Sequence, residues 1–165
     1  MKIIGALLIV ICGVLIGSEL RERLRSRVRI LGEYESVCLR MISMIRFQHT
    51  PLDRLIVKLK DSDSDVISMC GLYVDEGDDF REAWEKAVAS SGEIQLLREE
   101  EKKLIKELGE YIGRSDSDGE ITMLGGMKEE FGKAAKRAQK ELSEKSRVYS
   151  VCGVLGGIMC ALMVI

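Results

Sequence analysis

The sequence contains few of the residues that interrupt helices or build sheets. It has one proline, Pro51, and aromatic residues make up only 5% of its 165 residues. Valine, isoleucine and threonine show no sustained alternation with polar residues, which is the pattern of a half-buried strand. Apolar residues instead recur at three- and four-residue steps, as on one face of a helix. We therefore predict an all-α fold for a chain of about one domain's length.

Residues that usually carry catalysis or bind metals are also scarce. The single histidine, His49, has no second histidine or cysteine at metal-ligand spacing, so we interpret it as a capping or packing residue. Phosphate loops, nucleophile elbows and zinc-protease motifs are missing from the sequence. The aspartates of Asp61–Asp65 do not form a calcium loop, because Val66 stands where that loop needs glycine. We expect no catalytic residue, no metal and no cofactor, and hence a protein that is not an enzyme.

The cysteines and the longest carboxylate run also lack the spacing of a reactive site. The five cysteines stand at positions 12, 38, 70, 152 and 160. Because none forms a C-x-x-C pair, we interpret them as small apolar residues in a reducing or membrane environment. We interpret Glu99–Glu101 as a solvated run, because consecutive helical residues point in different directions.

Charged residues are missing from both ends of the chain. Every charged residue except Lys2 lies between Glu19 and Arg147. The last eighteen residues also lack proline, and a helix of that length rises about 27 Å. This is close to the roughly 30 Å hydrocarbon core of a bilayer. We predict a membrane span over residues 148–165, in preference to a buried core helix, which would need a larger protein around it.

A second apolar run, residues 3–17, follows Lys2. Its short basic start also fits a secretory signal peptide, but Ile16–Ser18 is a poor cleavage site, so we favour a retained span. The predicted organisation is a transmembrane span over residues 1–18, a helical domain over 19–147 and a second span over 148–165.

Basic residues flank both predicted spans on the side of the helical domain. They are arginines 21, 23, 25, 27 and 29 after the first span, and residues 133, 136, 137, 140, 145 and 147 before the second. By the positive-inside rule, this pattern predicts a multi-pass protein of the cell membrane with residues 19–147 in the cytoplasm. We expect these side chains to contact membrane lipid and not nucleic acid.

Turn and capping residues divide the middle of the chain into helices. The first helix is expected to run from the span to about Phe47, before a turn at His49 in which Thr50 caps a short helix that begins at Pro51. Further helices are expected over 66–74, from Asp78 or Asp79 to about Ser90, over 94–112, and from Ser115 or Asp116 into the second span. The first and last helices carry matching apolar stripes. We predict that these two long helices pack antiparallel as a stalk in a helical bundle.

Two glycine pairs with four-residue spacing lie in the predicted spans. They are Gly13 with Gly17, and Gly153 with Gly157. Small residues allow close approach of helices in lipid, where no hydrophobic force draws them together. We predict that the two pairs face each other within one chain. The alternatives are a homo-oligomer, in which the pairs face other subunits, and glycines that the membrane helices simply tolerate.

The region between Asp53 and Glu120 has more aspartate and glutamate than lysine and arginine. Such an excess favours fast and salt-sensitive encounter with a basic surface. We interpret this acidic region as a docking surface for a basic partner.

Three stretches together resemble a known family. They are His49–Leu52, Leu108–Asp116 and Val151–Gly157. In the second stretch, Gly109, Gly113 and Asp116 form a G-x-x-x-G-x-S-D pattern. With the two-span organisation, these stretches resemble the stage III sporulation protein AB family of spore-forming bacteria over essentially the whole chain.

The family is similar to the cytoplasmic helical domain of the type II secretion inner-membrane F protein. The resemblance implies a non-enzymatic part in the apparatus that links mother cell and forespore, with the helical domain on the mother-cell side. It implies a secretion-type ATPase and other sporulation channel proteins as partners. One departure is Glu120, where the family pattern often has glutamine.

Two functions from different classes follow. The first is a scaffold of a secretion-like complex that docks its ATPase through the acidic region. The alternative is a membrane-anchored helical adaptor or receptor-like signalling protein whose stalk passes a conformational change across the bilayer.

Overall fold

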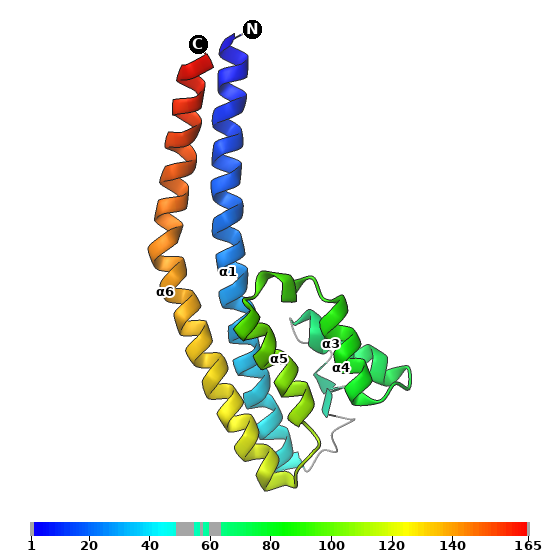
Figure 1. Ribbon diagram of the computed structural model, residues 1–165. Helices are drawn as coiled ribbons and strands as arrows, with labels where there is room; N and C mark the ends of the chain where they lie inside the picture. Colours follow the sequence, from blue (N-terminus) through cyan, green and yellow to red (C-terminus); the bar gives the residue numbers. More distant parts are fainter. Residues whose placement is uncertain (1, 49–54, 57, 60–63, 165) are drawn as a thin grey trace. The chain divides into compact units, whose positions relative to one another are not determined.

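The computed structural model describes residues 2–48, 55–56, 58–59 and 64–164, and it describes side chains for 11–47, 55–56, 58–59, 64–146, 148, 151, 155 and 159. These residues form α-helices, one 3-10 helix and no strand (Figure 1). The elements are α1 (Lys2–Gln48), α3 (Asp65–Asp75), α4 (Phe80–Ser90), η1 (Glu93–Leu96), α5 (Glu99–Tyr111) and α6 (Ser117–Val164). The all-α prediction is confirmed for this part of the chain.

The chain divides into two compact units. Unit 1 comprises residues 1–28 and 136–165, which are the first part of α1 and the last part of α6. Unit 2 comprises residues 29–135 and contains the rest of both helices with α3, α4, η1 and α5 between them. As predicted, α1 continues without a break to Gln48, and α6 continues without a break to Val164.

The predicted membrane spans lie largely among residues whose side chains are outside the described set. Over the residues that are described, no helix has both the length and the apolar character needed to cross a membrane.

Within unit 2, α1 and α6 run antiparallel, as predicted. The Tyr34 ring of α1 stacks on the Phe131 ring of α6, with centroids 5.2 Å apart and planes 19° apart. Two to three turns further along α1, Met41 and Ile45 line a small hollow with Leu124, which precedes Phe131 on α6. Later residues of α1 therefore contact earlier residues of α6, which is the pattern of antiparallel helices.

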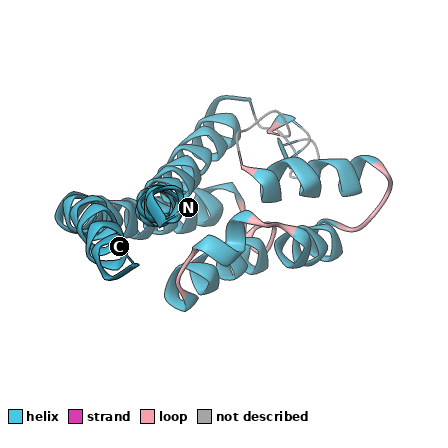
Figure 2. Cartoon of the chain, turned by 90° about the horizontal axis from the view of Figure 1, so that it is seen from above, coloured by secondary structure: helices cyan, strands magenta, loops and turns pink. Residues whose placement is uncertain are grey.

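The core of unit 2 covers more of α1 than its predicted stripe. Leu31, Cys38, Met41 and Ile45 are buried, as the three- and four-residue steps predict. The side chains of Tyr34 and Val37, which are outside that stripe, are also fully buried. The short helices gather on one side of α1 and α6 lies on the other (Figure 2), so apolar residues are required on two sides of this helix.

Several predicted helix ends are confirmed. Asp79 caps α4, because its Oδ2 accepts a hydrogen bond from the Arg81 backbone N–H at 3.2 Å. Gly77 follows α3 with a φ of +105°, in the left-handed region that glycine adopts at low cost. Four residues of the short segment after Pro51 are described, and the three apolar ones, Leu55, Ile56 and Leu59, are all buried.

The single helix predicted over 94–112 is wrong. The chain forms η1, leaves helical geometry at Leu97 and Arg98, and then begins α5 at Glu99. Glu101 explains the second start, because its Oε2 accepts a hydrogen bond from the Arg98 backbone N–H at 3.0 Å. Glu101 is only 5% exposed. The prediction that it belongs to a solvated carboxylate run is therefore wrong for this residue.

Candidate functional site

A tryptophan packed on a glycine holds α4 against α5. The Trp84 side chain of α4 is 2% exposed, and its indole Nε1 donates a hydrogen bond to the Ile105 carbonyl oxygen of α5 at 3.1 Å. A Cβ atom at Gly109 would overlap the indole ring. Gly109 therefore permits the close approach of the two helices, which gives a packing reason for the first glycine of the G-x-x-x-G-x-S-D pattern.

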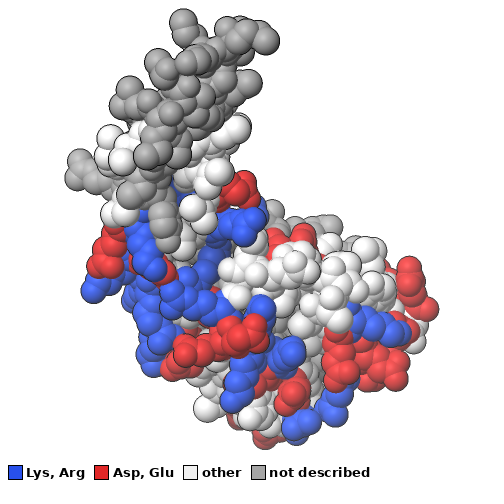
Figure 3. All heavy atoms as spheres, turned by 45° about the horizontal axis from the view of Figure 1, so that its top comes forward, with Lys and Arg blue, Asp and Glu red and all other residues white. Residues whose placement is uncertain are grey.

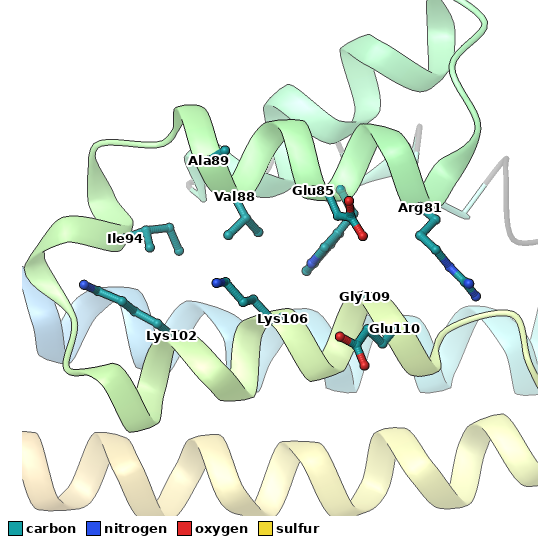
Figure 4. A pocket seen from close by; sticks show the side chains of 10 residues that line it. Arg81, Glu85, Val88, Ala89, Ile94, Lys102, Lys106, Gly109 and Glu110 are labelled. Atoms are coloured by element: carbon teal, nitrogen blue, oxygen red, sulfur yellow. The ribbon is translucent and has the colours of Figure 1, made fainter.

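A cleft of about 430 Å³ opens beside this contact, between α4 and α5 (Figure 4). Its lining residues come from α4, η1 and α5, and they are Arg81, Trp84, Glu85, Val88, Ala89, Ile94, Lys102, Lys106, Gly109 and Glu110. Apolar side chains and the indole form the α4 and η1 side of the cleft, and charged side chains stand on its edges. A cleft of this size, with an apolar wall and charged side chains at its edges, is suited to binding a ligand.

The two ends of the cleft carry different charges. Lys102 and Lys106 are one helical turn apart on α5, and Figure 4 shows both facing the side of the cleft that holds Val88 and Ile94. At the other end, Figure 4 shows Glu85 of α4 and Glu110 of α5 facing each other across the cleft, with Arg81 beyond them.

One of the two lysines also contacts a carboxylate on its own helix. The Lys102 Nζ lies 2.7 Å from Glu99 Oε1, and this hydrogen bond lowers the pKa of Glu99. The Glu99 side chain is 88% exposed. An ion pair so exposed contributes little to stability. Lys102 can therefore exchange Glu99 for a carboxylate of a ligand at little cost in free energy.

The remainder of the same pattern forms the corner between α5 and α6. Gly113 has a φ of +84°, and its backbone N–H donates to Glu120 Oε1 at 2.7 Å. Asp116 caps α6 as predicted, because its Oδ1 accepts from the Gly119 backbone N–H at 3.0 Å. Glu120, the departure from the family pattern, thus serves as an acceptor for the turn.

The other predicted motif residues are outside these contacts. His49, Thr50 and Pro51 lie outside the described residues. Gly13 and Gly17 are in the part of α1 that belongs to unit 1, and Gly17 is buried. Gly153 and Gly157 are in the part of α6 that belongs to the same unit, and no contact between the two pairs is described.

Burial favours the neutral forms of three side chains of unit 2, Tyr34, Cys38 and Cys70, because it raises the pKa of each. Burial raises the pKa of the Cys38 thiol, and likewise that of Cys70, from 9.0 to about 12. Burial also raises the pKa of the Tyr34 phenol above its usual value. Protonated thiols are poor nucleophiles and poor metal ligands. In the described part of the chain, no three His, Cys, Asp or Glu side chains are placed to hold a metal ion.

Unit 1 contains an ion pair that the sequence analysis missed. Arg27 of α1 was expected to contact lipid, but it is 6% exposed, and its Nη1 donates to Glu141 Oε2 of α6 at 2.8 Å. The other oxygen of Glu141 accepts from Lys145 Nζ at 2.6 Å. The expectation of lipid contact is therefore wrong for Arg27. No local signal distinguishes it from the four neighbouring arginines.

Carboxylates gather on one edge of unit 2. Asp75 ends α3, and Glu76, Asp78 and Asp79 follow it in the connection to α4. Figure 3 shows acidic side chains clustered on the right-hand edge, where Figure 1 places this connection. Lys86 offsets part of this charge, because its Nζ lies 2.8 Å from Asp78 Oδ2.

The comparisons with known proteins gave one result. The family model described as stage III sporulation protein AB matches residues 2–165, which is nearly the whole chain. No curated protein and no solved structure matches it.

Proposed function

The chain belongs to the stage III sporulation protein AB family, and from that membership we propose that it is a non-enzymatic scaffold of a secretion-like complex between mother cell and forespore. The family match over residues 2–165 is the observation that carries this proposal. In this role, unit 2 is a preformed docking domain, and the chain acts by binding a secretion-type ATPase and other channel proteins.

Membrane anchoring is part of the proposal. The apolar composition of residues 1–18 and 148–165 supports two spans, and the basic residues beside them support a cytoplasmic position for the region between. A scaffold anchored in this way holds its docking domain beside the membrane on the mother-cell side.

The acidic edge of unit 2 is the proposed contact for the ATPase. Asp75, Glu76 and Asp79 of this edge are exposed, and Glu82, in the first turn of α4 that follows them, adds a further exposed carboxylate. Complementary charge on a partner raises the association rate and makes binding depend on salt.

The test measures binding of the full chain, in membranes, to the purified ATPase at increasing salt. Glu76→Lys and Glu82→Lys together should weaken binding and flatten its salt dependence. As a matched control, Glu129→Lys makes the same kind of charge change at an exposed position of α6. A salt response that is flat for the unaltered chain would remove the electrostatic contact. Isolation of the chain with a kinase or regulator in place of the ATPase would support the alternative signalling role.

A further inference from the structure

The α4–α5 cleft has an apolar base that the fold keeps partly open. Val88 and Ile94 are 7% and 8% exposed, and both line the cleft. Trp84 also lines it and packs against Gly109 on α5. Because this base is formed by helices that already contact each other, a ligand would meet a preformed surface, which lowers the entropic cost of binding.

The charges along the cleft indicate the chemistry of what fits there. Lys102 and Lys106 present two cations beside the apolar wall at one end, and Glu85 and Glu110 present two carboxylates at the other (Figure 4). Arg81 adds a further cation beyond the carboxylates. A complementary occupant needs a carboxylate at the lysine end, an apolar side chain in the middle and a cation at the glutamate end.

The length of the cleft indicates a helix as the occupant. Lys102 and Glu110 are eight residues apart on α5, which corresponds to about 12 Å along the axis. Side chains one turn apart on a second helix are spaced by about 6 Å. Three such side chains on successive turns span the same distance, so one face of a two-turn helix matches both the charges and the apolar centre.

We propose that the α4–α5 cleft is a docking groove for a helix of a protein partner, on which an apolar side chain lies between a carboxylate and a cation. This groove is separate from the acidic α3–α4 edge. The inference does not depend on the ATPase or on the sporulation role.

The test uses Trp84 as the reporter, because it is the only tryptophan of the chain. The full chain in detergent micelles is titrated with helix-stabilised synthetic peptides that carry Glu, Leu and Lys on successive turns. Peptides with Lys at both ends, with Glu at both ends, or with Asn in place of Leu serve as comparisons. We expect a saturable change in Trp84 emission with the Glu–Leu–Lys peptide and binding at least about tenfold weaker for the comparisons.

Charge-reversed variants make the test specific to the cleft. Lys102→Glu with Lys106→Glu should shift the preference to the peptide with Lys at both ends, and Glu85→Lys with Glu110→Lys should shift it to the peptide with Glu at both ends. Lys103→Glu is the matched control, because Lys103 lies on α5 outside the cleft lining and should leave the original preference unchanged. Circular dichroism establishes that each variant keeps its helices.

Three results would overturn the proposal. The first is Trp84 emission that no peptide changes. The second is a peptide preference that neither pair of reversals alters. The third is Trp84 emission that changes with protein concentration in the absence of peptide and loses this dependence in Lys102→Glu with Lys106→Glu. That result would mean that a second copy of the chain occupies the cleft.

Discussion

Two glycines inside helices have opposite surroundings in unit 2. Gly109 of α5 faces the Trp84 ring, which occupies the space that a Cβ atom would need. Gly126 of α6 has no atom within 4 Å of the equivalent position and is exposed. The same residue type therefore has a packing role at one position and only a conformational cost at the other.

This contrast predicts opposite effects for one substitution. Gly109→Ala should lower the free energy of unfolding by about 1–3 kcal/mol, because Trp84 must move. Gly126→Ala should raise the free energy of unfolding by up to about 1 kcal/mol, because alanine favours the helix and meets no neighbour. Thermal unfolding of the full chain, followed by circular dichroism, measures both. Stabilisation by both substitutions would contradict the Trp84–Gly109 contact.

The buried thiols predict a stability change at alkaline pH. In the folded chain Cys38 and Cys70 keep their protons to about pH 12, whereas the unfolded thiols ionise near their ordinary value of 9.0. A raised folded pKa stabilises the chain fully below the unfolded pKa, and that contribution is lost as pH rises from about 9 towards 12.

Cys38→Ala with Cys70→Ala removes this dependence. The difference in unfolding free energy between the unaltered chain and this double variant should be constant below about pH 8 and should shrink above about pH 9. Denaturant unfolding at a series of pH values gives this difference directly. If this difference stayed constant up to pH 11, the thiols would ionise as readily in the folded chain as in the unfolded chain.

Pairing of α1 with α6 in unit 1 depends on a partly buried ion pair. The Arg27 and Glu141 side chains are 7% and 15% exposed, so each charge needs the other. Arg27→Met should lower the free energy of unfolding by about 1–3 kcal/mol, because it removes the buried cation and leaves the Glu141 carboxylate with the more exposed Lys145. Adding Glu141→Leu should restore most of the loss, since two apolar side chains can replace a buried pair.

An exposed pair on α1 provides the control. Arg23 and Glu19 lie 3.3 Å apart with side chains 64% and 66% exposed. Arg23→Met should change the free energy of unfolding by less than about 1 kcal/mol. Equal losses for Arg27→Met and Arg23→Met would mean that burial does not set the strength of the Arg27–Glu141 pair.

The Arg27–Glu141 ion pair sets an expected register for the glycine pairs. Gly13 precedes Arg27 by fourteen residues, and the residue that follows Glu141 by fourteen is Leu155, between Gly153 and Gly157. If the antiparallel register continues, Gly13 lies level with the second glycine pair. Cysteines placed at 13 and 153, in a chain without its native cysteines, should then cross-link within one chain. Cross-links formed only between chains would assign the glycines to a homo-oligomer.

The proposed membrane topology predicts which part of the protein is accessible from outside the cell. Protease added to intact cells should leave the segment Asp61–Asp65 uncut, because the basic residues beside both proposed spans favour a cytoplasmic helical domain. Permeabilised cells serve as the control, and in them the same segment should be cut. Cleavage in intact cells would reverse the orientation.

Local chemistry explains why many elements could be predicted from the sequence. The caps at Asp79 and Asp116 and the turns at Gly77 and Gly113 depend on backbone groups a few residues away. Apolar steps of three and four residues were sufficient to predict the two long helices and their antiparallel packing. The family resemblance rested on the same local stretches, and the match over residues 2–165 confirms it.

Contacts between residues distant in the sequence decided the features that were missed. Packing buried Glu101 and made Arg27 half of an ion pair with Glu141, although neighbouring residues of the same type remained exposed. The α4–α5 cleft likewise depends on Trp84 meeting Gly109, twenty-five residues further along the chain. A sequence pattern reports which face of a helix is apolar. Which charged side chain lies under that face is settled only when a second helix covers it, because the free-energy cost of burying the charge depends on the partner it finds there.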